Sequence, residues 1–202
     1  MTSRRKLDAY VRRRDFAKTK EPRPDGARRK GGRRFVVHKH DATSLHYDFR
    51  LEFGGVLVSW AVPKGPSTDT RIKRLAIRTE DHPTAYVDFE GVIPEGEYGA
   101  GTVLVWDTGT YENLRASKGS ERKSMQAALK DGLIEVFLHG KKLEGGYALK
   151  RTGGGKKPRW LMIKMRDEYA DARRNPTHTE PDSVRSGRSL GEIAAEDADA
   201  AG

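Results

Sequence analysis

The stretch LHYDFRLEF, residues 45–53, alternates strictly between two kinds of side chain. One kind is apolar or aromatic and comprises Leu45, Tyr47, Phe49, Leu51 and Phe53. The other kind is polar and comprises His46, Asp48, Arg50 and Glu52. Because successive side chains of a β-strand point to opposite faces, the stretch predicts a strand with one face in a hydrophobic core. Its other face carries histidine, aspartate and arginine in series rather than the lysine and threonine typical of an exposed strand, which indicates a site.

Seven further runs of branched and aromatic residues, bounded by turn residues, predict strands over residues 33–40, 56–62, 73–79, 102–107, 133–140, 145–151 and 159–165. About eight short strands favour an all-β barrel or sandwich, and we expect a mainly β, compact, single-domain barrel. A short N-terminal helix is predicted within residues 3–16, and one further helix over residues 121–132, limited by Ser120 and Gly132. The glycine-rich stretch EGEYGAGT, residues 95–102, precedes a strand and is assigned to turns.

The positive charge of the chain is unevenly placed. Residues 1–34 contain 14 lysines and arginines against 4 acidic residues, which accounts for the whole net charge of +10. Such an arm suits a polyanion such as nucleic acid, although a solubilising tail is an equal alternative. We expect a basic N-terminal arm over residues 1–32, a barrel over 33–166 and a disordered acidic tail over 167–202.

Composition excludes several classes of protein. Cysteine is absent, so neither disulfides nor thiolate metal sites can form. The apolar runs are too short to span a membrane, and the N-terminus lacks the apolar core of a secretion signal. We therefore expect an intracellular, soluble protein. Our expectation for its location and assembly is a cytoplasmic, nucleoid-associated monomer.

The opening strand and the segment before it predict a metal site. The turn DATS, residues 41–44, can fold the preceding strand back and bring His40 beside His46. Together with Asp48, two imidazoles and one carboxylate suit Mn²⁺, Fe²⁺ or Zn²⁺ and leave coordination positions open. Arg50 follows on the same face, where a fixed cation could hold phosphate oxygens. His38 shares the parity of His40; we expect it to support the ligands, with a fourth ligand or an exposed side chain as alternatives.

The segment KRLAIRTEDHP, residues 73–83, repeats the pattern. An apolar set, Leu75, Ile77 and Thr79, alternates with a charged set, Arg74, Arg78 and Glu80. His82 follows and could act as a general acid or base, although Arg74 and Glu80 could equally form an ordinary ion pair. Lys64 lies between prolines as a candidate phosphate contact, and Tyr86 could either hydrogen-bond into the site or pack.

Four motifs together resemble one family. They are HDATSLHYDFRLE, SWAVPKGPS, EDHPTAYVDFEGVIPEGEYGAGTVLVWDTGTY and RRDFAKTKEP, and they resemble the 3′-phosphoesterase domain of bacterial and archaeal DNA ligase D over residues 7–165. The resemblance implies a β-barrel enzyme that uses Mn²⁺, with Co²⁺ or Zn²⁺ as alternatives, to heal DNA 3′ ends at breaks during end joining. Such an enzyme removes a terminal ribonucleoside and then the remaining 3′-phosphate.

The resemblance also implies residue roles. The metal ligands would be His40, His46 and Asp48. The residues serving the chemistry and the phosphate would be Arg50, Lys64, Arg74, Glu80, His82 and Tyr86. The substrate-binding residues would be Arg14, Asp15, Glu21 and His38, the last being a position where other members often carry glutamine.

Partners and competing functions follow from the same pattern. Ligase and polymerase modules are absent from this chain, so a stand-alone enzyme would act on DNA 3′ ends with a separate ligase, polymerase and end-binding protein. A non-catalytic nucleic-acid-binding barrel is one alternative. A 2-oxoacid-dependent oxygenase, with His139 as the third ligand and Lys150 holding the oxoacid, is another.

Overall fold

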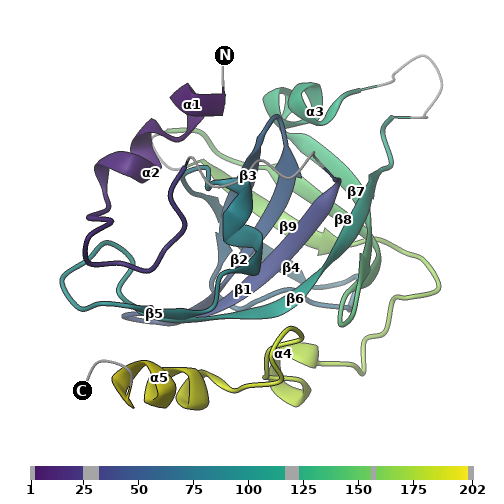
Figure 1. Ribbon diagram of the computed structural model, residues 1–202. Coiled ribbons are helices and arrows are strands. Elements are labelled where there is room, and N and C mark those ends of the chain that lie inside the picture. The colour runs from purple at the N-terminus through teal and green to yellow at the C-terminus, as the bar shows by residue number, and fades with distance from the viewer. Residues whose placement is uncertain (1–2, 25–31, 117–122, 156–157, 200–202) are drawn as a thin grey trace.

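The protein forms a closed β-barrel with short helices around it (Figure 1). This computed structural model describes residues 3–24, 32–116, 123–155 and 158–199. The strands are β1 (Arg34–Asp41), β2 (Leu45–Phe53), β3 (Val56–Val62), β4 (Lys73–Arg78), β5 (Gly91–Ile93), β6 (Gly101–Asn113), β7 (Leu133–Gly140), β8 (Glu144–Arg151) and β9 (Arg159–Lys164). The helices are α1 (Ser3–Lys6), α2 (Asp8–Arg12), the 3₁₀-helix η1 (Thr84–Asp88), α3 (Met125–Asp131), α4 (Pro176–Thr179) and α5 (Leu190–Asp199).

The strands run in the order β1-β2-β3-β4-β9-β8-β7-β6-β5, and β1 also pairs with β6. That additional pairing closes a ring of eight antiparallel strands and leaves β5 outside it, on the edge of β6. The expectation of a mainly β, single-domain barrel of about eight strands is therefore confirmed. Closure also removes the exposed edges that an open sheet would present.

Strand β6 is longer than its apolar run predicts. It pairs with β1 over Thr102–Thr110 and passes on to β7 over Gly109–Asn113, so the turn-like sequence after Asp107 continues a strand that changes neighbours. Gly109 permits this corner, because a Cβ atom there would lie 2.0 Å from the carbonyl oxygen of His139. The short strand β5 is not apparent from the sequence.

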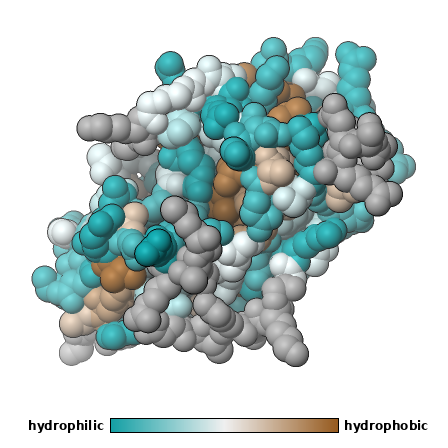
Figure 2. Space-filling view, turned by 90° about the horizontal axis from the view of Figure 1, so that it is seen from above, coloured by the Kyte–Doolittle hydropathy of each residue, from teal (hydrophilic) through white to brown (hydrophobic). Residues whose placement is uncertain are grey.

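Apolar side chains form two clusters, one on each side of the barrel wall. The inner cluster fills the barrel and includes Trp60, Trp106 and Trp160. The outer cluster covers β1, β3 and β6 and consists of Tyr10, Val36, Leu57, Tyr86, Val87, Phe89, Ile93, Val103 and Val105. Seen from above, the molecular surface is mostly hydrophilic with a few separate apolar patches (Figure 2). The N-terminal segment and η1 thus lay a second apolar layer over the outer wall.

Strand β4 faces the opposite way from the expectation. Ala76 is buried, whereas Leu75 is 41% exposed, so the alternation expected from Leu75 and Ile77 is inverted. Pairing of Trp60 with Arg78 directs Arg78 inward, and its guanidinium lies 5.4 Å from the Trp60 ring. Arg74 shares this inward parity, because it pairs with the buried Met162.

The helix after β6 agrees with the expectation except at its start. Ser124 is the N-cap, accepting a hydrogen bond from the Ala127 amide, and Gly132 ends the helix with φ of 83°. A left-handed residue at this position favours glycine, which has no Cβ. Ser120, the expected cap, lies outside the described residues.

Residues 167–199 were expected to be a disordered tail, but the structure packs them along one side of the barrel, with α4 and α5 beneath β5 and β6 in the view of Figure 1. Ile193 is 2% exposed and belongs to the inner cluster. Trp106 Nε1 and Lys142 Nζ both donate to the Glu180 carbonyl, at 2.8 and 2.7 Å. The sequence does not predict this packing, because the barrel holds much of the tail through hydrogen bonds to its backbone and the buried Ile193 alone makes no apolar pattern. Among the described helices, none has the length and apolarity needed to cross a membrane.

Candidate metal and phosphate site

The candidate site lies on the outer wall of the barrel, at the hairpin between β1 and β2. The antiparallel register sets His40 opposite His46 and His38 opposite Asp48, as the turn over residues 41–44 predicts. The two imidazole rings of His40 and His46 lie with their centroids 4.8 Å apart. With Asp48 they form a group whose ligand atoms all lie within 4.8 Å of one another.

The geometry of this group fits a metal ion. Asp48 Oδ2 lies 3.8 Å from His46 Nε2 and 3.9 Å from His40 Nδ1. Metal–ligand bonds of about 2.1 Å place neighbouring ligand atoms about 3.0–3.4 Å apart, so Asp48 and the two histidines would move about 0.4–0.9 Å closer around an ion. His46 Nδ1 donates to the Ser44 carbonyl at 2.9 Å, which fixes the tautomer and leaves Nε2 as an acceptor facing Asp48.

The electrostatic environment keeps Asp48 ionised. Burial alone would raise the pKa of this carboxyl, but Arg50, His40 and His46 together hold it below its usual range. Arg50 is the nearest cation, donating from Nη2 to Asp48 Oδ2 at 3.0 Å. An anionic oxygen is the form that a divalent cation requires.

Arg50 is held on several sides although it is only 3% exposed. Besides Asp48, its guanidinium donates to Ser59 Oγ at 2.8 Å and to His38 Nδ1 at 3.3 Å, and Nη1 lies 2.9 Å from His82 Nδ1. His38 is fully buried and contacts Arg50 rather than the ligand group, so it supports the arginine. Burial, with Arg50 beside it, lowers the pKa of His38 well below its usual value and keeps it a neutral acceptor.

His82 is also buried and neutral. Burial lowers its pKa well below the usual value, and the neighbouring Arg50 and Arg14 lower it further. Its Nδ1 lies 3.1 Å from the Glu80 carbonyl, and its Nε2 lies 3.4 Å from Arg14 Nη2. Between two guanidinium groups the imidazole stays neutral and is a weak base, because a proton added to it would be repelled by both cations.

The N-terminal segment forms one wall of the site. Arg14 lies 3.7 Å from the centroid of the Tyr10 ring and donates to Glu21 at 2.9 Å and to Glu80 at 2.6 Å. Tyr86 on η1 donates its hydroxyl to the same Glu21 oxygen at 3.0 Å, and burial followed by Glu21 raises the pKa of Tyr86. The carboxylates of Glu21 and Glu80 therefore link the N-terminal segment, η1 and the end of β4 around Arg14.

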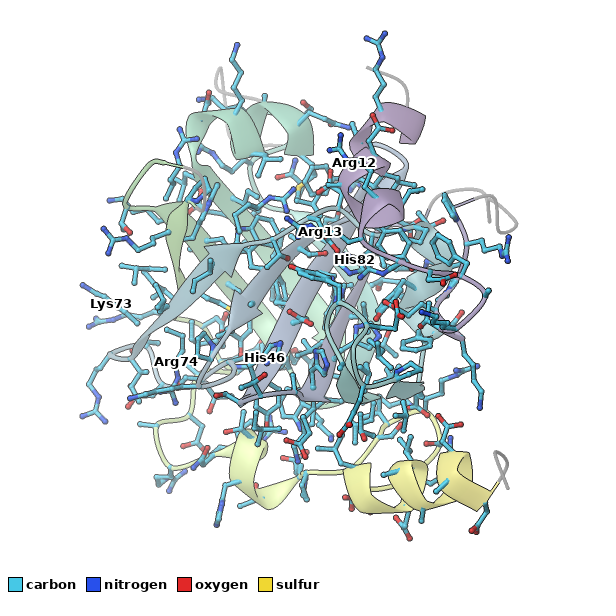
Figure 3. All side chains as sticks on the ribbon, turned by 90° about the vertical axis from the view of Figure 1, so that its left-hand side faces the viewer. Arg12, Arg13, His46, Lys73, Arg74 and His82 are labelled. Carbon is cyan, nitrogen blue, oxygen red and sulfur yellow. The ribbon has the colours of Figure 1, made fainter. Side chains whose placement is uncertain are left out.

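These side chains surround a cavity of about 290 Å³. Eight of the residues expected at the site line it: Arg14, His40, His46, Asp48, Arg50, Glu80, His82 and Tyr86. Glu21 and His38 contact this lining from behind. Figure 3 shows His82 and Arg13 on one side of His46 and Arg74 on the other.

Besides Glu21 and His38, three expected residues do not line the cavity. Asp15 has a side chain 49% exposed and accepts from the Ala17 amide at 3.0 Å, so it stabilises a turn of the N-terminal segment. Lys64 is exposed beyond the end of β3. Arg74 has the inward parity of β4, which faces away from the outer wall.

Sequence reasoning missed several residues of the cavity, notably Thr79, Tyr98 and Gly99. The signal for Tyr98 was an aromatic residue placed between glycines in EGEYGAGT, which indicated only turns. The oxygenase alternative required His139 beside the ligand group, but His139 pairs with Glu112 at 2.8 Å on the exposed side of β7.

Fold and site together define a class of protein: a β-barrel with a His-His-Asp group beside a buried arginine, suited to holding a divalent cation and a phosphate. The sequence-family model of the DNA ligase D 3′-phosphoesterase domain matches residues 38–151, and the chain belongs to this family. The multifunctional non-homologous end joining protein LigD of Pseudomonas aeruginosa is 45% identical over 195 residues, covering 94% of this chain and 22% of that protein. The LigD proteins of Mycobacterium tuberculosis and Mycolicibacterium smegmatis are 46% and 45% identical over 164 residues, covering 81% of this chain. The chain thus spans about a fifth of the length of these curated relatives.

Proposed function

We propose that this protein is a metal-dependent phosphoesterase that heals the 3′ ends of DNA breaks, removing a terminal ribonucleoside and then the 3′-phosphate. Membership of the ligase D phosphoesterase family supports a role in DNA end repair. The observation that carries the proposal is a metal-ligand group that shares one cavity with a buried arginine. An oxygenase or a simple binding module has no need of that combination.

The residues present suit Mn²⁺, with Co²⁺ or Zn²⁺ as alternatives, held by His40, His46 and Asp48. Such an ion would supply Lewis acidity at a phosphate oxygen. Arg50 supplies a second, fixed positive charge. Three of its five N–H groups donate to His38, Ser59 and Asp48, and a second N–H on Nη2 can donate to the phosphate. Because Arg50 is already held in place, little reorganisation accompanies charge development on the phosphate.

In the first reaction, a water oxygen forms a bond to phosphorus while the bond from phosphorus to the O5′ of the terminal nucleoside breaks. His82, a neutral imidazole that lines the cavity, is the group we assign to take the proton of that water and pass it on, since its lowered pKa keeps it from retaining the proton. The proton ends on the departing O5′ hydroxyl, and a 3′-phosphate remains. A second hydrolysis at the same site releases inorganic phosphate and leaves a 3′-hydroxyl.

The substrate in this proposal is a DNA 3′ end, with a separate ligase, polymerase and end-binding protein as partners in repair. Lys64, which is exposed, would contact the DNA outside the cavity rather than the reacting phosphate, whereas Arg74 on the inward face of β4 has no such role in this proposal. The basic residues of the arm would add affinity that does not depend on sequence.

The test is gel-resolved cleavage of a 5′-labelled primer–template that ends in one ribonucleotide, with and without Mn²⁺. We expect metal-dependent shortening to a 3′-phosphate and then to a 3′-hydroxyl in the wild type, and neither product with His46→Ala. DNA binding measured by anisotropy should survive in that variant. Binding by the wild type without any change to the DNA end would instead establish a non-catalytic nucleic-acid-binding barrel.

A further inference from the structure

One aromatic residue of this chain differs from all the others in its exposure. The sequence contains three tryptophans, seven tyrosines and six phenylalanines, and all of them lie within the described residues. Only Tyr98 among them is exposed, at 50%. It lies in the turns between β5 and β6 and lines the same cavity as the metal-ligand group.

The local backbone places Tyr98 next to that group. Gly96 and Gly99 on either side have φ values of 84° and 83°, a conformation that favours glycine. The turn is closed by hydrogen bonds from the Glu97 amide to Pro94 and from the Ala100 amide to Glu97, at 3.2 and 3.1 Å. A Cβ at Gly99 would lie 3.9 Å from His40 Cε1, so this turn passes directly beside a metal ligand.

The Tyr98 ring is fixed from one side. The Arg13 guanidinium lies 4.6 Å from the ring centroid, and Arg13 Nη1 also donates to the Tyr98 hydroxyl at 2.7 Å. Half of the residue nevertheless stays exposed, so ring surface remains for a ligand. A preoriented, exposed aromatic ring beside a cationic phosphate site is the arrangement on which a nucleobase stacks.

The N-terminal segment closes this end of the cavity. Arg13 Nη1 joins Tyr98 to Glu80, with 2.6 Å to the Glu80 carboxylate, and Lys18 lies 3.6 Å from Glu97 on the same turn. Glu80 and Tyr98 both line the cavity, and the single Nη1 atom of Arg13 bridges them. An end closed in this way accommodates the terminus of a strand rather than a strand that continues.

We propose that Tyr98 is a specificity-determining residue: its ring stacks on the base of the terminal nucleoside while the adjoining phosphate lies at Arg50. This inference rests on the proposed function and deepens it, since it distinguishes the first reaction from the second. A nucleoside-terminated end presents a base to Tyr98, whereas a 3′-phosphate end has already lost it. Tyr98 therefore acts on substrate binding in the first reaction and takes no part in the transfer of the proton.

The experiment compares wild type, Tyr98→Ala and Tyr98→Phe on two primer–templates, one ending in a ribonucleotide and one in a 3′-phosphate. We expect Tyr98→Ala to lower kcat/KM on the ribonucleotide end about tenfold, mainly through KM, and to have a much smaller effect on the 3′-phosphate end. A tenfold change corresponds to about 1.4 kcal/mol, within the range for one stacked base. Tyr98→Phe keeps the ring and should stay within about threefold of the wild type.

A third substrate separates stacking from a merely structural role. It ends in a ribose that lacks a base, and on it Tyr98→Ala should cost nothing further, because the partner of the ring is already gone. An equal loss from Tyr98→Ala on all three ends, or a loss with Tyr98→Phe as large as with Tyr98→Ala, would overturn the inference. If the wild type alters none of the ends, the proposed function itself fails and the inference falls with it.

Discussion

Arg14 and Arg13 are adjacent and share one partner, Glu80, which makes them a matched pair for testing how the N-terminal segment is held. Arg14 Nη1 and Arg13 Nη1 each lie 2.6 Å from a different oxygen of this carboxylate. The side chain of Arg14 is 4% exposed, whereas that of Arg13 is 46% exposed. The two ion pairs have equal N–O distances but different exposure to water. Losing one or the other should therefore lower the free energy of unfolding by very different amounts.

Replacing Arg14 with alanine leaves the carboxylate of Glu21, whose side chain is fully buried, without its cation. Loss of one partner from a buried ion pair costs about 3–5 kcal/mol, because the remaining charge stays desolvated. Replacing Arg13 removes a largely solvated pair and should cost about 1 kcal/mol or less. Burial of the Arg14–Glu21 pair therefore accounts for an expected difference of about 2–5 kcal/mol.

Urea unfolding of the two variants, followed by tryptophan fluorescence, measures the difference directly. A double variant, Arg14→Met with Glu21→Gln, removes the buried charge as well and should recover part of the loss. If Arg14→Ala and Arg13→Ala lower the free energy of unfolding equally, then the N-terminal segment is not packed on the barrel in solution. The interpretation that this segment forms one wall of the site would then be wrong.

Three further predictions concern the site and the tail. Arg50→Lys keeps the positive charge but loses the planar set of guanidinium donors, so turnover should fall about 100-fold or more. Mn²⁺ affinity, measured by calorimetry, should change far less. Equal losses of turnover and Mn²⁺ affinity would contradict separate roles for Arg50 and the metal ligands. The lowered pKa of His38 means that the folded, metal-free protein binds fewer protons than the unfolded chain below about pH 6.5, so stability falls as pH falls through that window. The side-chain carbonyl of glutamine can still accept from Arg50, so His38→Gln should keep this contact. In unfolding titrations the variant should reduce the loss of stability on acidification by about 1 kcal/mol per pH unit. An unchanged slope would show that His38 is protonated in the folded state. Ile193→Ala should lower the free energy of unfolding by about 2–3 kcal/mol, against under about 0.5 for the exposed Glu196→Ala, and the same small value for both would mean that α5 is detached.

Local features of this protein were predictable because they depend on neighbours in the chain. Strand β2 occupies the residues whose alternation predicts it, and β1 and β3 lie within one residue of the expected bounds. The grouping of His40, His46 and Asp48 followed from the same local information. A short turn joins His40 to His46, and once the turn is set, antiparallel pairing determines which side chains meet.

Strand β4 and Tyr98 show where local information ends. Both faces of KRLAIR carry residues that could be buried, and only pairing with β3 and β9 turned Ala76 inward and Leu75 outward. A tyrosine between glycines predicts only a turn. Nothing near it in the sequence shows that this turn lies beside His40.

The sequence by itself determined the strands, the polar face of β2 and the His-His-Asp group. Only the tertiary structure decided that this polar face is covered, by an arm and a 3₁₀-helix that bury Arg14, Glu21 and Glu80 together. Arg14 and Glu80 are 66 residues apart, and a chain with 39 basic and 29 acidic residues offers many such pairs. Hydrophobic periodicity in the sequence predicts which face of a helix or strand is buried. It does not predict which acidic and basic side chains pair, because that depends on which of these pairs tertiary packing removes from water.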